Sequence, residues 1–101
     1  MYLVREVFIA KPGHAGEFAE LMKKEMTSDP KFKGYVLLDM VTNYNKIVCE
    51  YEIESLAAWE SMMMKYRKEA KDKQSEEKKD NKPPKYTELY LTGKREIYKI
   101  L

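Results

Sequence analysis

The sequence has 101 residues, of which 44% are hydrophobic, 36% charged and 12% aromatic, a composition typical of one small soluble domain over residues 1–101. Cys49 is the single cysteine, which excludes an intrachain disulfide and a multi-cysteine zinc site. We therefore expect a cytoplasmic protein that holds no metal and no cofactor. No apolar run approaches the ~20 residues of a membrane span, and the first residues lack the pattern of a secretory signal.

The formal net charge is +2, from 19 Lys and Arg against 17 Asp and Glu, and it is unevenly distributed. Between Lys65 and Lys85 there are nine basic and five acidic residues. A nucleic-acid patch would be free of acids and interleaved with aromatic residues, which this stretch is not. Mixed charges of this kind are typical of a solvated helix face, so we expect neither a nucleic-acid nor a membrane partner.

The first half of the chain predicts a strand, a helix and a hairpin. Residues 2–10 are rich in β-branched and aromatic side chains and end at Lys11-Pro12-Gly13, which predicts a strand followed by a turn. Apolar residues then recur at helical spacing over residues 14–27. Residues 34–42 and 46–53 predict two strands, joined at Asn43-Tyr44-Asn45 by residues that tolerate left-handed turn conformations. In the second of these strands Ile47, Cys49, Tyr51 and Ile53 share one apolar face, which should meet the helices.

The second half predicts a longer helix and a last strand. Ser55 offers an N-cap hydroxyl, and a helical stripe follows it that should enter the core. Beyond the stripe, helix-favouring polar residues continue to Asp80, before Pro83 and Pro84. Residues 94–101 predict the closing strand. The stripe consists of Leu56, Trp59, Met63, Tyr66 and Ala70.

The resulting order, βαββαβ, predicts an α+β, ferredoxin-like fold, in which a four-stranded antiparallel sheet carries both helices on one face. The first strand then lies between the third and the last. An antiparallel register that sets Arg5 opposite Glu96 also sets Glu6 opposite Arg95, so that both cross-strand pairs are complementary. The other sheet face has no helix, and we expect it to form a homodimer interface.

Several segments together resemble a known group of proteins: residues 10–18 (AKPGHAGEF), the Asn-containing hairpin, the helix that bears Trp59, and residues 92–98 (TGKREIY). Over nearly the whole chain these are similar to the dimeric α+β barrel superfamily, and within it to small NIPSNAP-like and antibiotic-biosynthesis-monooxygenase-like members. The resemblance implies two sheets that close a barrel across a dimer, and a pocket between each sheet and its helices. The Asn, His and Trp set of haem-degrading relatives is not matched, so haem is not expected.

Four charged residues are candidates for chemistry: His14, the only histidine, and Arg5, Glu50 and Arg95, charges inside strands of a covered sheet. His14 has no visible acid or nucleophile partner, which also fits a structural role. Together with Glu6, these three strand charges must be paired or face a polar cavity, and ion pairs that lock the barrel are favoured over catalysis. The consecutive Met62, Met63 and Met64 point about 100° apart on a helix, so they favour packing over a soft-metal site.

Aromatic residues are candidates for ligand binding, although the same spacing is typical of core packing. We expect a small hydrophobic or aromatic molecule in a pocket between sheet and helices. A cofactor-independent monooxygenase, in which Arg5 or Arg95 stabilises a substrate anion, and a non-catalytic assembly module both stay open as alternatives. The aromatic candidates are Tyr35, Tyr51, Trp59, Tyr66 and Tyr98.

Overall fold

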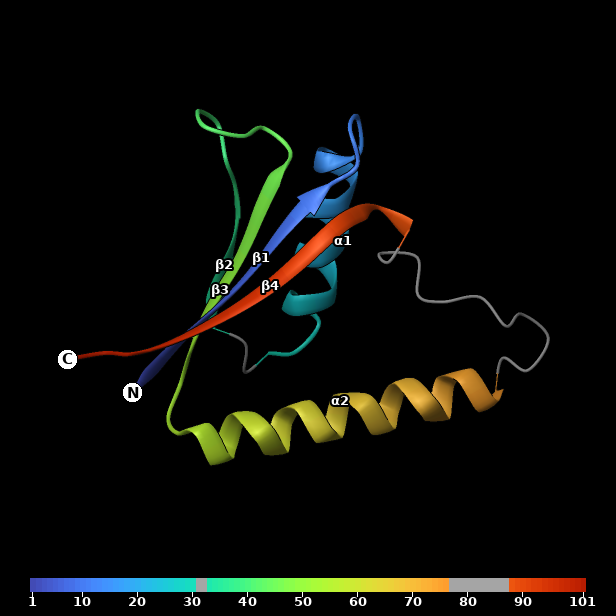
Figure 1. Ribbon diagram of the computed structural model, residues 1–101. Coiled ribbons are helices and arrows are strands. Elements are labelled where there is room, and N and C mark those ends of the chain that lie inside the picture. Colours follow the sequence, from blue (N-terminus) through green and yellow to red (C-terminus); the bar gives the residue numbers. More distant parts are fainter. Residues whose placement is uncertain (31–32, 77–87) are drawn as a thin grey trace.

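The computed structural model describes residues 1–30, 33–76 and 88–101, with residues 70–76 described as backbone. One antiparallel sheet has the strand order β2-β3-β1-β4, with the two helices as connections (Figure 1). This confirms the ferredoxin-like α+β fold. None of the helices among the described residues is long and apolar enough to cross a membrane. The elements are β1 (Tyr2–Ala10), α1 (Ala15–Thr27), β2 (Gly34–Leu38), β3 (Lys46–Ile53), α2 (Leu56–Glu76) and β4 (Tyr90–Lys99).

The register of the two terminal strands is the predicted one. In β1 and β4, Arg5 lies opposite Glu96 and Glu6 lies opposite Arg95. Successive side chains of a strand point to opposite faces, so these two charge pairs lie on different sides of the sheet. Glu6 shares its face with Val4, which is part of the core under the helices, and Arg5 therefore faces the side without helices.

The core occupies the helix-covered face and has two parts. Phe18 and Met22 of α1 cover Ile47 and Cys49 of β3, with Ala10 and Leu89 completing the cluster. A second cluster is formed by Val4, Tyr51 and Ile53, on which Trp59 and Met62 of α2 pack. The apolar face of β3 thus meets the helices, as its alternation predicts.

Only part of the apolar stripe predicted for α2 reaches the core, namely Trp59. The side chains of Leu56 and Tyr66 are 49% and 42% exposed, and Met62 rather than Met63 packs on the second cluster. Figure 1 shows why: α2 crosses one end of the sheet and its C-terminal half continues past the strands, whereas α1 lies alongside them. The predicted continuation of this helix to Asp80 lies outside the described residues.

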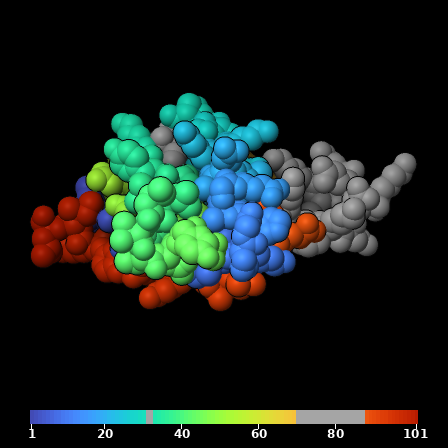
Figure 2. All heavy atoms as spheres, turned by 90° about the horizontal axis from the view of Figure 1, so that it is seen from above, coloured from blue at the N-terminus to red at the C-terminus, as the bar shows by residue number. Residues whose placement is uncertain are grey.

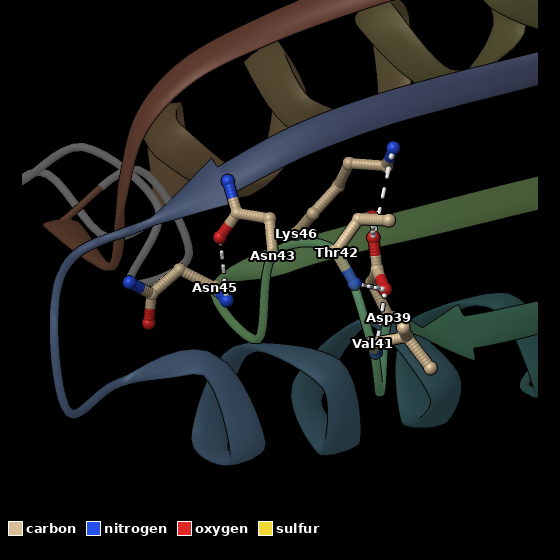
Figure 3. Close-up of polar contacts among 6 residues, drawn as sticks. All are labelled: Asp39, Val41, Thr42, Asn43, Asn45 and Lys46. Atoms are coloured by element: carbon tan, nitrogen blue, oxygen red, sulfur yellow. Dashed lines mark hydrogen bonds and ion pairs between the residues drawn. The ribbon is translucent and has the colours of Figure 1, made fainter.

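The hairpin between β2 and β3 has a longer loop than predicted, because β2 ends at Leu38 rather than Thr42. Asp39 Oδ1 accepts hydrogen bonds from the backbone N–H groups of Val41 and Thr42, both at 3.0 Å (Figure 3). The Asp39 side chain thereby turns the chain out of the strand. In a second turn of this kind, Asn45 N–H donates to Asn43 Oδ1 at 3.0 Å.

Residues 43–45 do not adopt the left-handed conformation that they tolerate. Among the described residues, only Gly13 has a positive φ. The loop instead turns where backbone N–H groups donate to the side-chain oxygens of Asp39 and Asn43. Figure 2 views the molecule from the hairpin end, where the loop (green) forms the surface beside the turn that leads into α1 (blue).

The last strand begins at Tyr90 and ends at Lys99, so it is four residues longer at its start, and two shorter at its end, than residues 94–101. Gly93 does not interrupt it. Gly93 pairs with Phe8 of β1, and a Cβ built on Gly93 would lie 3.2 Å from the Phe8 ring. A glycine thus belongs inside this strand because an aromatic ring lies against its backbone.

Candidate functional site

The four charged candidates do not form one site. Arg5 and Glu50 lie on the open face of the sheet, where Arg5 Nε is 3.6 Å from Glu50 Oε2. Arg95 lies on the opposite, helix-covered face. His14 stands before α1, and its Nδ1 lies 3.3 Å from Glu17 Oε2. The structure therefore separates these residues into three places, and of the four only Arg95 lies against α2, over Trp59.

The aromatic candidates divide in the same way. Tyr35 and Tyr98 are exposed on the open face, by 71% and 47%. Tyr51 is buried beneath α2, and Trp59 and Tyr66 belong to α2 itself. The three aromatic residues on the helix side, together with Arg95, make up the candidate site.

A half-buried carboxylate, that of Glu6, organises this site. Glu6 Oε1 accepts a hydrogen bond from Arg95 Nε at 2.9 Å and forms an ion pair with Arg95 Nη2 at 2.7 Å, and the Glu6 side chain is only 12% exposed. The Arg95 guanidinium lies over the Trp59 ring, 5.0 Å from its centroid, a cation–π arrangement. Trp59 Nε1–H in turn donates to the Tyr51 hydroxyl at 3.1 Å. We call Glu6, Arg95, Trp59 and Tyr51 the polar relay.

Sequence reasoning placed Glu6 among the strand charges that must be paired and as the cross-strand partner of Arg95, but not among the candidate site residues. Strand alternation contains a signal for its position, because Val4, Glu6 and Phe8 share one face and the other two are apolar. A carboxylate between two core positions must be paired. Arg95 provides that partner from the neighbouring strand.

Burial and the charge of Glu6 raise the pKa of two groups near Glu6: Tyr51 of the site and Cys49, two residues before it on β3. Burial, and secondarily Glu6, raise the pKa of the Tyr51 hydroxyl to about 12, although the hydrogen bond from Trp59 opposes this. The same two causes raise the pKa of the Cys49 thiol to about 12. At neutral pH Tyr51 is a neutral phenol and Cys49 a protonated thiol. Such a site can hold and orient a ligand, and the Cys49 thiol is not activated as a nucleophile.

A groove of about 710 Å³ opens beside the relay, between β3, the end of α1 and α2. Its apolar wall includes Tyr51, Ile53 and Met62, and Tyr66 lies on its rim. The Tyr66 hydroxyl donates to Asp29 Oδ2 at 3.2 Å, which links α2 to the chain that follows α1. The remaining lining residues are Ser28, Asp29, Pro30, Lys33, Glu52, Ser61, Lys65 and Glu69.

Comparison with solved structures identifies the fold. A NIPSNAP domain protein from Burkholderia xenovorans superposes with a TM-score of 0.72 over 100% of this chain and 95% of its own, at 9% sequence identity. The chain has the fold of a NIPSNAP domain. A NIPSNAP-like domain protein from the same organism covers 99% of this chain and 84% of its own, with a TM-score of 0.61 and 14% identity.

A protein from Agrobacterium tumefaciens shares the same fold, with a TM-score of 0.64 and 15% identity, over 98% of this chain and 92% of its own. Neither a protein-family model nor a curated protein matches the sequence. The NIPSNAP-like resemblance is thus confirmed for the fold, and the chemistry of the site has to be argued from its own residues.

Proposed function

We propose that this chain binds a small aromatic or other apolar molecule in the groove between β3 and α2. The observation that carries the proposal is the groove itself, whose volume of about 710 Å³ falls within the range of small-molecule sites. Aromatic and thioether side chains line it together with charged side chains. This is the combination that binds an apolar body and orients one polar end.

The relay supports the same proposal, because it fixes the groove wall. Tyr51 lines the groove and is held by Trp59, which is itself stacked on Arg95. Arg95 pairs with Glu6 through Nε and Nη2, and its side chain is 43% exposed. This pairing fixes Tyr51 in the groove wall through Trp59, and a ligand with an anionic group would meet Lys33 or Lys65, the two cationic residues of the groove lining.

The planar fluorophore 8-anilinonaphthalene-1-sulfonate tests the groove. We expect saturable binding to the folded protein, weakened at least about fivefold by Tyr66→Ser, which removes one wall of the groove. Tyr44→Ser is the matched control, because Tyr44 is 76% exposed in the hairpin loop and distant from the groove. Equal affinity in both variants, or binding that does not saturate, would contradict the proposal.

A second proposal concerns the open face of the sheet, which we infer to be a homodimer interface. Leu37 is 42% exposed there and lies opposite Val48, between the exposed Tyr35 and the hairpin loop. Exposed apolar side chains on a face without helices support association rather than a free surface. In sedimentation velocity, Leu37→Glu is expected to lower the association of the chain, and Val41→Glu, at a fully exposed loop position, is expected to leave it unchanged. Identical behaviour of the two variants would argue against this interface.

A further inference from the structure

The outer side of α2 carries apolar side chains that the fold leaves uncovered. Leu56 and Met64 are 49% and 63% exposed, and with Trp59 and Met63 they line a groove of about 500 Å³ against Ile97 of β4. Glu60 and Arg67 are the two charged residues of the same groove. This surface, which we call the α2 side groove, is separate from both the ligand groove and the open sheet face.

Helical geometry explains why this side is free. Each residue advances about 100° around a helix, so Leu56, Glu60, Met63 and Arg67 lie along one side. That side is turned by roughly 100° from the one on which Trp59 and Met62 pack against the core. The sequence stripe predicted for the core thus falls partly on a lateral surface of α2. Spacings of four, three and four residues are those of a helix–helix seam.

The charges on this seam favour one particular occupant. We propose that the α2 side groove binds the α2 helix of a second copy of this chain, in antiparallel orientation. With the two-fold axis between Met63 and Met64, Glu60 lies opposite the partner's Arg67, and Arg67 lies opposite the partner's Glu60. Met63 then packs on the partner's Met64. Symmetry repeats each contact, as an isologous interface requires.

The alternatives fit less well. A parallel pairing in register sets Glu60 on the partner's Glu60 and Arg67 on the partner's Arg67, so both contacts are repulsive. A membrane surface would have to accept Glu60 among the apolar side chains, at a cost. A second antiparallel copy supplies both complementary charges at the required spacing without any further partner.

Disulfide trapping tests the orientation directly. Chains that carry Glu60→Cys are mixed with chains that carry Arg67→Cys, and oxidation of the mixture is expected to give a covalent dimer. Each variant alone should give little, because two equivalent positions lie about 10 Å apart along the antiparallel seam. A mixture of Lys65→Cys and Glu69→Cys chains, on the other side of α2, is the control and should not cross-link. Cross-linking that is equal in all samples, or absent from the first mixture, would overturn the proposal.

Charge exchange tests the same contact without cysteine. Glu60→Arg and Arg67→Glu are each expected to weaken self-association at least about tenfold, and the double variant is expected to recover it to within about threefold. Glu69→Arg introduces the same charge change on the other side of the helix and should have no such effect. Circular dichroism confirms that each variant is folded. A double variant no better associated than the single ones would contradict the pairing.

Discussion

Gly93 allows the Phe8 ring to lie against the backbone of β4. The ring is also part of an aromatic cluster, with centroids 5.0 Å from Phe18 and 5.2 Å from Tyr90, so it has little room to move. A side chain at position 93 would push this cluster apart, since its Cβ already meets the ring at 3.2 Å. The close approach also explains why a strand predicted to begin after Gly93 in fact runs through it.

We therefore expect Gly93→Val to lower the free energy of unfolding by about 1–3 kcal/mol, the usual cost of overpacking a core. Urea unfolding measures this value. Gly16→Ala is the control, because a Cβ on this α1 residue meets nothing within 4 Å, and it should raise stability by about 0.5–1 kcal/mol. Similar stability of Gly93→Val and the unsubstituted protein would show that the ring moves freely.

Cys49 illustrates how position decides the chemistry of a residue. The sequence places it on the helix-facing side of a strand, and the structure confirms a buried free thiol in the core under α1. Burial, reinforced by Glu6, raises its pKa to about 12, so at about pH 8 only roughly one thiol in ten thousand is ionised. An unfolded chain, with an ordinary thiol pKa near 8.5, would be ionised to roughly a quarter.

The folded protein should accordingly react with Ellman's reagent at least about a hundredfold more slowly than the chain unfolded in guanidinium chloride. The release of thionitrobenzoate gives both rates. A Val41→Cys variant, with its thiol at a loop position 91% exposed, should show one fast and one slow thiol. Fast reaction of the unsubstituted folded protein would mean that Cys49 is accessible after all.

The carboxylate of Asp39 holds the loop between β2 and β3 in its conformation. The hydrogen bond from the Thr42 hydroxyl, followed by those from the backbone N–H groups of Val41 and Thr42, holds the pKa of Asp39 well below its usual range. Lys46 adds an ion pair, with its Nζ 3.7 Å from Asp39 Oδ2. A lowered pKa in the folded state means that the ionised form is favoured by folding.

The stability contributed by this charge is therefore present above the unfolded pKa of about 4, and is lost as the pH falls below it toward the folded value. Asp39→Asn retains an acceptor oxygen for the loop but cannot ionise. We expect the difference in free energy of unfolding between the two proteins to shrink as the pH falls from about 5 to 2. Urea unfolding at several pH values measures it, and a difference independent of pH would contradict the assignment.

The strands and helices could be predicted where the signals that set their bounds lie within the element itself. The first strand, the third strand and the end of the first helix lie where the pattern sets them, because alternation and the Pro30 break act within the element itself. The end of β2 was missed because the Asp39 side chain, rather than a turn sequence, closes that strand. The sequence can suggest a turn at an Asp residue, but it does not show that the strand ends there.

The site was less predictable, for a physical reason. Periodicity groups residues on a face of α2 but contains no information on how far the sheet extends beneath the helix. Trp59 reaches the core and Leu56 does not, although both belong to the same stripe. Similarly, the pairing of Glu6 with Arg95 follows from strand register, whereas the position of Trp59 over Arg95 depends on the crossing of α2 over the sheet.

The whole molecule has two proposed surfaces for self-association, and one chain can use both at the same time. The open sheet face and the α2 side groove lie on different elements, and each would be isologous. A chain with two different isologous contacts assembles beyond the dimer, while a chain that retains only one of them stops at the dimer. The size of the particle in solution therefore reports on each surface separately.

We expect the unsubstituted protein to form particles larger than a dimer at high concentration, as measured by light scattering coupled to size exclusion. Leu37→Glu and Glu60→Arg should each reduce these particles to dimers, and the combined variant should be a monomer of 12.0 kDa. Val41→Glu and Glu69→Arg, which alter neither surface, should keep the original size. If Glu60→Arg alone has no effect, the helix contact is wrong while the sheet interface stands. If Leu37→Glu alone has no effect, the sheet interface is wrong.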